Sequence, residues 1–189
     1  MSILVAVKKH GEIVIASDSA QTEDGMIVSA EYYVNNNKII QCGESYIGLV
    51  GWSCTQDIME SIIREHASKM QLDSRASIFD TFRFIHTQLK DEYFIETSED
   101  KDQPVESSQI GALIVGPGGI FEIESYRTVT EYSKFWALGS GKKLGLGALQ
   151  AVYDSLDSAE EIAMIAVKSA CALDDACAEP IYLHQITIN

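Results

Sequence analysis

Short apolar segments separated by turn-forming residues fill the first fifty positions of the chain. Each segment is four or five residues long and rich in valine, isoleucine and leucine, which is typical of strands rather than helices. We therefore expect five strands in this part of the chain, at residues 3–7, 13–17, 26–29, 38–41 and 46–50.

The hydrophobic period then changes to that of helices. Apolar side chains recur every three to four residues in two stretches, which predicts amphipathic helices at residues 55–70 and 77–93. Ile62 in the first and Phe82 in the second lie on the expected buried faces. A polar run without any apolar period follows at residues 96–108, and it predicts a solvated loop.

Strand and helix patterns return in the second half. Two apolar runs flank a Gly-Pro-Gly-Gly turn and predict a hairpin, and Ser158 followed by Glu161 predicts a capping box at a helix start. The expected elements are strands at 110–115, 120–124, 135–138 and 181–188, and helices at 144–154 and 158–174. Strands, two helices, strands, two helices and a strand make a single α+β domain over residues 1–189, in which paired helices can cover two stacked sheets.

Composition excludes several classes of function. The 189 residues carry 14 Lys and Arg against 28 Asp and Glu, a net charge of −14 that repels nucleic acid and anionic membranes. The apolar runs are too short for a membrane span, and the first is too short for a signal peptide. Four cysteines without a C-x-x-C pair predict reduced thiols, so we expect a cytoplasmic protein without a nucleic-acid or membrane partner.

Candidate chemistry begins at the second residue. If Met1 is removed, Ser2 carries a hydroxyl nucleophile and a free α-amine, which titrates at about 7.7–8.0 and can act as a base at cellular pH. The strand that follows the next turn ends in Asp18. Residues 139–143, Gly-Ser-Gly-Lys-Lys, lack the spacing of a phosphate-binding loop, and the histidines stand at no zinc spacing from the cysteines. We expect neither a cofactor nor a metal.

Six short segments in this order give the chain a resemblance to a known family. The chain resembles proteasome β-type subunits and their bacterial homologues of the HslV type, within the N-terminal nucleophile hydrolases. The resemblance spans nearly the whole chain and implies a four-layer αββα sandwich. It is carried by Ser2 and the strand after it and by residues 16–19, 37–40, 47–51, 137–141 and 170–175.

The resemblance also implies a catalytic set. Ser2 would replace the usual threonine nucleophile of this threonine-type endopeptidase family and attack a peptide carbonyl while its own α-amine takes the proton. Lys38 would place an ammonium beside the nucleophile, and Asp18 would be the carboxylate that holds this ammonium. Gly48 would offer its backbone N–H to the oxyanion. Ser140 and Asp175 would orient the amine.

The chain departs from the family pattern at several of these positions. The segment between Asp18 and Lys38 is about four residues longer than usual, so the place of Lys38 depends on an insertion around residues 31–36. The family often has a serine three residues after its late aspartate, where this chain has Ala178. Serine at position 2 also lacks the methyl group that stiffens a threonine rotamer.

The resemblance implies a self-compartmentalising peptidase whose identical subunits form a ring or stacked rings with the active sites inside. Its substrates would be polypeptides, and a regulatory ATPase is a conceivable partner. Two other functions stay open on the same fold: a catalytically silent structural ring subunit, favoured if Met1 is retained, and a small-molecule amidase or acylase.

Overall fold

The computed structural model describes residues 2–188 and contains two antiparallel sheets. The first sheet has the strand order β10-β1-β2-β11. In this sheet β1 pairs with β2 from Leu4 opposite Ser17 onward, and with β10 from Leu4 opposite Leu138. Its strands are β1 (Leu4–Lys9), β2 (Glu12–Ser17), β10 (Phe135–Leu138) and β11 (Tyr182–Thr187).

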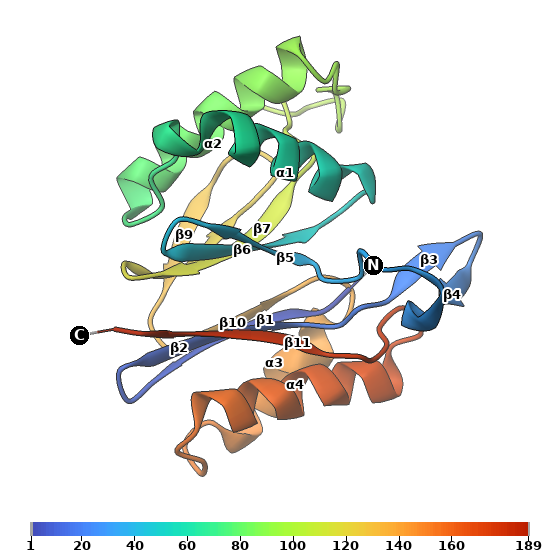
Figure 1. Cartoon of the computed structure of the whole chain (residues 1–189), viewed down its shortest axis with the longest axis vertical. Helices are drawn as coiled ribbons and strands as arrows, with labels where there is room; N and C mark the ends of the chain where they lie inside the picture. The colour runs from blue at the N-terminus through green and yellow to red at the C-terminus, as the bar shows by residue number, and fades with distance from the viewer. Residues whose placement is uncertain (1, 189) are drawn as a thin grey trace.

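The second sheet has the order β5-β6-β7-β8-β9, so each strand pairs with its neighbour along the chain. It lies face to face with the first sheet (Figure 1). A short hairpin of β3 (Gln21–Glu23) and β4 (Met26–Val28) projects beside the N-terminus. The strands of the second sheet are β5 (Ile39–Cys42), β6 (Ser45–Val50), β7 (Gly111–Gly116), β8 (Gly119–Ile123) and β9 (Val129–Tyr132).

Two pairs of helices cover the outer faces of the sheets (Figure 1). The helices α1 (Cys54–His66) and α2 (Arg75–Asp91) lie on the five-stranded sheet. The helices α3 (Lys142–Val152) and α4 (Ala159–Leu173) lie on the four-stranded sheet. The expected four-layer αββα sandwich is therefore confirmed.

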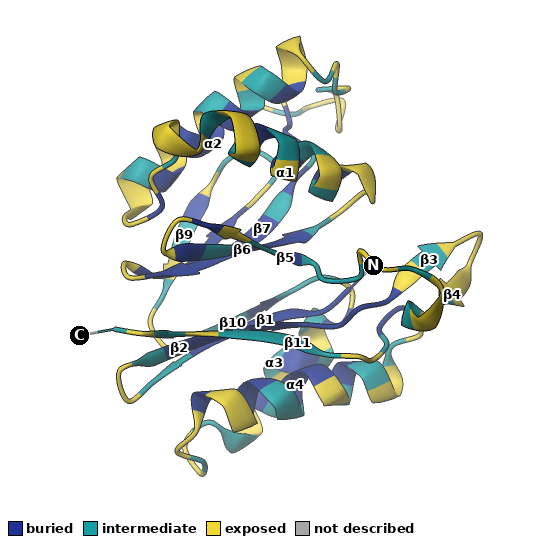
Figure 2. Cartoon of the chain, in the orientation of Figure 1, coloured by how far each residue is buried: buried dark blue, intermediate teal, exposed yellow. Residues whose placement is uncertain are grey.

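Burial follows these layers, since the apolar side chains form three stacked clusters (Figure 2). One cluster lies between the sheets and includes Leu4, Ile15 and Leu113. The other two lie between each sheet and its helices, with Phe82 of α2 and Ile162 of α4 among their fully buried members. Each sheet thus buries one face against the other sheet and the opposite face against the apolar sides of its helices.

Several boundaries differ from the sequence-based expectation. The strands β3 and β9 were not predicted, because both are short and have no alternation of apolar and polar residues. The predicted first helix ends as an α-helix at His66 and continues as a single 3-10 turn over Ala67–Lys69. Of the capping box predicted at Ser158 the N-cap bond is present, where its hydroxyl accepts from the N–H of Glu161 at 3.1 Å. Within the described residues, no helix is long and apolar enough to cross a membrane.

Candidate active site

Asp18 follows β2 and lies at the centre of a buried polar network. Its side chain is fully buried, and its two oxygens accept four hydrogen bonds. The Oδ1 atom accepts from the N–H of Ile3 at 2.9 Å and from the ammonium of Lys38 at 2.7 Å. The Oδ2 atom accepts from the N–H groups of Ala20 at 3.0 Å and Ala178 at 3.3 Å. The carboxylate therefore ties the start of β1 to the chain after α4 and to Lys38.

Lys38 is brought to this position by an ordered segment rather than by a loose insertion. The Asn36 amide donates to the carbonyls of Ala30 at 3.3 Å and Tyr33 at 3.1 Å, and thereby folds the extra residues back on themselves. The Leu49 N–H then donates to the Lys38 carbonyl at 3.2 Å, which fixes the entry into β5. The insertion inferred from the sequence thus leaves Lys38 beside Asp18, as expected.

Ser140 approaches Ser2 from the end of β10. The preceding Gly139 has φ +100°, and a Cβ on it would lie 2.1 Å from the carbonyl oxygen of Ser2. Only glycine permits this close approach of the two chain segments. As a result the N–H of Ser2 donates to Ser140 Oγ at 3.2 Å, and the N–H of Gly141 donates to the Ser2 carbonyl at 3.2 Å.

The aspartate that contacts Ser140 is Asp174 and not the predicted Asp175. Asp174 is the C-cap of α4, and its Oδ1 accepts from Ser140 Oγ at 3.3 Å and from the N–H of Ala176 at 2.9 Å. Asp175 is exposed, and we find no hydrogen bond of its side chain within residues 2–188. The helix end explains the error, because a shift of one residue at the cap turns the next side chain to solvent.

This correction also finds a residue that the sequence reasoning missed. Cys177 stands three residues after Asp174, is buried, and lies close enough to Asp174 for that carboxylate to act on its thiol. Burial, together with the nearby charges of Asp18 and Asp174, raises the pKa of the Cys177 thiol well above its usual range. The thiol therefore stays protonated and can donate its S–H. Counting from Asp174 instead of Asp175 would have identified this position.

Gly48 was expected to serve the oxyanion, and its place in the sheet contradicts that role. It lies inside β6, opposite Ile39 and Leu113, and a Cβ on it would lie 2.7 Å from a Leu4 methyl group. Gly48 therefore serves the packing between the two sheets. The glycine that lines the cavity beside Ser2 is Gly51, which follows β6 with φ +133°.

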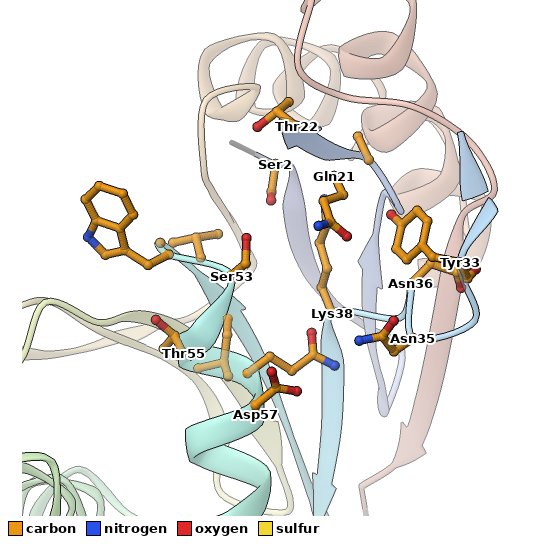
Figure 3. A pocket seen from close by; sticks show the side chains of 16 residues that line it. Ser2, Gln21, Thr22, Tyr33, Asn35, Asn36, Lys38, Ser53, Thr55 and Asp57 are labelled. Atoms are coloured by element: carbon orange, nitrogen blue, oxygen red, sulfur yellow. Dashed lines mark hydrogen bonds between the residues drawn. The ribbon is translucent and has the colours of Figure 1, made fainter. Parts of the chain in front are cut away.

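A cavity of about 570 Å³ opens at this network (Figure 3). Ser2 and Lys38 line it, together with the chain after β6 and the first turn of α1. The lining residues come from the chain before β1, after β2 and before β5, from β3, from the end of β6 and from α1, so the cavity lies at one edge of the sandwich beside the N-terminus. Gly51, Gln56 and Asp57 are among the residues that line it.

The arrangement offers a hydroxyl, a neighbouring ammonium and hydrogen-bonding groups around one main-chain nitrogen. Lys38, 14% exposed, is the cation nearest to Asp18, and Ser140 bridges the Ser2 nitrogen to Asp174. This is the chemistry of nucleophilic attack with proton transfer. Among residues 2–188, no group of three or more His, Cys, Asp or Glu side chains could hold a metal ion. The expected removal of Met1 concerns a residue outside the described range.

Comparison with known proteins gives consistent relatives, although no family model matches the chain. The proteasome subunit beta of Nanoarchaeum equitans is 25% identical over 200 residues, which cover 99% of this chain and 93% of that protein. Thiobacillus denitrificans BPH, solved in complex with epoxomicin, shares 34% identity at a TM-score of 0.92, with 99% of both chains covered. HslV from Trypanosoma brucei, at 16% identity over 98% of this chain and 99% of its own, shares the fold with a TM-score of 0.70.

Proposed function

The chain belongs to the family of proteasome β-type and HslV-like proteins, and we propose that it is a self-compartmentalising N-terminal nucleophile peptidase that acts through Ser2 once Met1 has been removed. One observation carries the proposal: the Ser2 nitrogen donates to Ser140 Oγ at 3.2 Å in the cavity that Lys38 also lines. The hydroxyl nucleophile and its base, the α-amine, would therefore both belong to Ser2, with the fixed ammonium of Lys38 lining the same cavity.

The proposed reaction has two steps. The Ser2 hydroxyl attacks the carbonyl carbon of the scissile peptide bond, and the Ser2 α-amine takes the hydroxyl proton. The C–N bond then breaks, the proton passes to the leaving amine, and an ester remains on Ser2. Water adds to this ester with the α-amine again as base, which releases the acid product and restores the hydroxyl.

The neighbouring residues would assist this reaction electrostatically. The ammonium of Lys38, held by Asp18 at 2.7 Å, would favour the deprotonated states of the hydroxyl and the amine. Ser140, in contact with Asp174 at 3.3 Å, would orient the amine. In place of Gly48, the main-chain N–H of Gly51 is our candidate for binding the oxyanion, since Gly51 lines the cavity.

Association of identical subunits into a ring is part of the proposal. Large apolar side chains are exposed near the cavity and on α4, which is unusual for a monomeric surface. Tyr32 is 81% exposed, Val34 98% and Leu173 74%. Burial of these side chains between copies would remove them from water and close the site to folded proteins in the cytoplasm.

Epoxomicin, which contains a peptide epoxyketone, tests the nucleophile, because the epoxyketone group reacts with both the hydroxyl and the α-amine. We expect mass spectrometry of the treated protein to show loss of Met1 and an adduct on the peptide that begins with Ser2. Ser2→Ala should abolish the adduct. Ser53→Ala changes another serine that lines the same cavity, and it should keep the adduct.

The same experiment separates the two rival functions. An intact Met1-Ser2 terminus without adduct would refute the peptidase and favour the silent ring subunit. Labelled protein that hydrolyses small amides but ignores fluorogenic peptides would favour the amidase. Size-exclusion chromatography with light scattering tests the ring, and a stable monomer would contradict it.

A further inference from the structure

The charge that the cavity presents to a substrate comes from Asp57. This residue lies in the first turn of α1, is exposed, and is the carboxylate among the residues that line the cavity. Within residues 2–188 it has no ion pair. Lys38 is the cation that lines the same cavity, but its ammonium is already paired with the buried Asp18 at 2.7 Å, whereas Asp57 has no such partner among these residues. One negative charge is therefore left for a ligand.

The amides around this carboxylate also favour a donor. The Gln56 amide nitrogen donates to the Asn37 carbonyl at 2.7 Å and to the Glu60 carboxylate at 3.1 Å, so its carbonyl oxygen remains to accept. The Tyr33 hydroxyl donates to the Ser19 carbonyl and is not available to an anion. The cavity therefore combines a carboxylate with a neighbouring acceptor, which suits an ammonium or guanidinium group.

Distance within the cavity selects a long side chain. Figure 3 shows Ser2 and Asp57 toward opposite ends of the cavity, with Lys38 between them. A peptide whose carbonyl carbon lies at the Ser2 hydroxyl must extend a side chain along the cavity to reach Asp57. Arginine and lysine combine this length with a positive charge, whereas leucine or phenylalanine would leave the carboxylate without a partner.

We propose that Asp57 makes this site select substrates with a basic residue, arginine or lysine, on the amino side of the cleaved bond. This inference depends on the proposed function, because it concerns the same cavity and the same nucleophile. The position of Asp57 at the N-terminus of α1 also suits the helix dipole, but that role does not require the side chain to line a cavity.

Matched fluorogenic peptides that differ only in this residue test the inference. The measured quantity is kcat/KM with arginine divided by kcat/KM with leucine. We expect a ratio of at least about ten for the unchanged protein, since a hydrogen-bonded charge pair contributes about tenfold or more. Asp57→Asn should lower the ratio about tenfold, and Asp57→Lys should favour a glutamate peptide. Glu65→Gln removes an exposed carboxylate elsewhere on α1, and it should leave the ratio unchanged.

Labelling of Ser2 by epoxomicin, measured in parallel, separates the two proposals. If Ser2 is labelled but arginine and leucine peptides are cleaved equally, or Asp57→Asn keeps the original ratio, the basic preference is wrong and the peptidase proposal stands. If Ser2 is not labelled and no peptide is cleaved, both proposals fail. Thermal unfolding of Asp57→Asn controls for a loss of helix stability, which would lower both rates alike and not their ratio.

Discussion

Replacement of Asp18 by asparagine tests whether the fold depends on the charge at its centre. The substitution keeps the shape of the side chain but removes its charge and turns one oxygen into an NH₂ group. Either orientation of the amide directs this NH₂ at existing donors, because Oδ1 faces Ile3 N–H and Lys38, and Oδ2 faces Ala20 N–H and Ala178 N–H. At least two donors then lose an acceptor in a buried place.

The cost can be estimated from these contacts. Removing one partner of a buried ion pair destabilises a protein by about 3–5 kcal/mol, because the other charge stays buried and uncompensated. Asp18 is fully buried and Lys38 is 14% exposed, so a loss of about 3–4 kcal/mol is expected. For a domain of this size, each kcal/mol lowers Tm by about 2–4 °C. We therefore expect Asp18→Asn to melt roughly 10 °C below the unchanged protein.

Urea unfolding followed by tryptophan fluorescence measures this loss, at one fixed protein concentration because association also stabilises. Lys38→Met and the double variant complete a double-mutant cycle. The stability loss of the double variant should be smaller than the sum of the two single losses by at least about 1 kcal/mol. Asp157→Asn, at a fully exposed carboxylate 3.3 Å from His10, is the control and should leave the midpoint unchanged. If Asp18→Asn lowers the free energy of unfolding by less than about 1 kcal/mol, or if the two losses are strictly additive, the central role of this pair is refuted.

Three further predictions follow from single contacts. Ser140→Ala should lower kcat/KM at least about tenfold with little change in Tm, because the hydroxyl is exposed and contacts the Ser2 nitrogen. Gly48→Ala should cost about 1–3 kcal/mol in urea unfolding, since its Cβ meets Leu4, whereas Gly51→Ala strains the backbone at φ +133° and should also lower peptide hydrolysis. Burial lowers the pKa of His184 from 6.5, so the folded state disfavours its protonation. The free energy of unfolding should therefore fall as pH drops below 6.5, and His184→Phe should weaken this dependence.

The layers of the fold were predictable because their residues repeat a physical pattern. Alternating apolar residues in strands and a three-to-four spacing in helices bury one face each, and both patterns are strong in this chain. The strands β3 and β9 were not predicted, because Gln21–Glu23 and Val129–Tyr132 pair without such a pattern. Each pairs with its neighbouring strand along the chain in a local hairpin, and short polar strands of this kind carry no apolar alternation from which the pairing could be predicted.

The two errors in the site have a common physical cause. Gly48 and Gly51 differ in sequence by three positions, and Asp174 and Asp175 by one, so residue type alone could not separate them. Backbone direction separates them in space. Gly51 follows the last ladder position of β6, and Asp174 ends α4 with extended dihedrals of φ −99° and ψ 126°. Where a strand or helix ends decides which of two similar residues lies beside the cavity or contacts Ser140.

The contacts that position Ser2 come from residues 2 and 3 themselves. The Ser2 carbonyl accepts from Gly141 N–H at 3.2 Å, the Ile3 N–H donates to Asp18 at 2.9 Å, and the Ile3 carbonyl accepts from Asp18 N–H at 3.2 Å. None of these bonds involves residue 1, so its removal deletes none of them. These bonds hold the main chain at Ser2 in place, and under the proposed function such pre-organisation would lower the cost of catalysis. Under the proposed function, activity should then appear as Met1 is removed, without a refolding step between the two events.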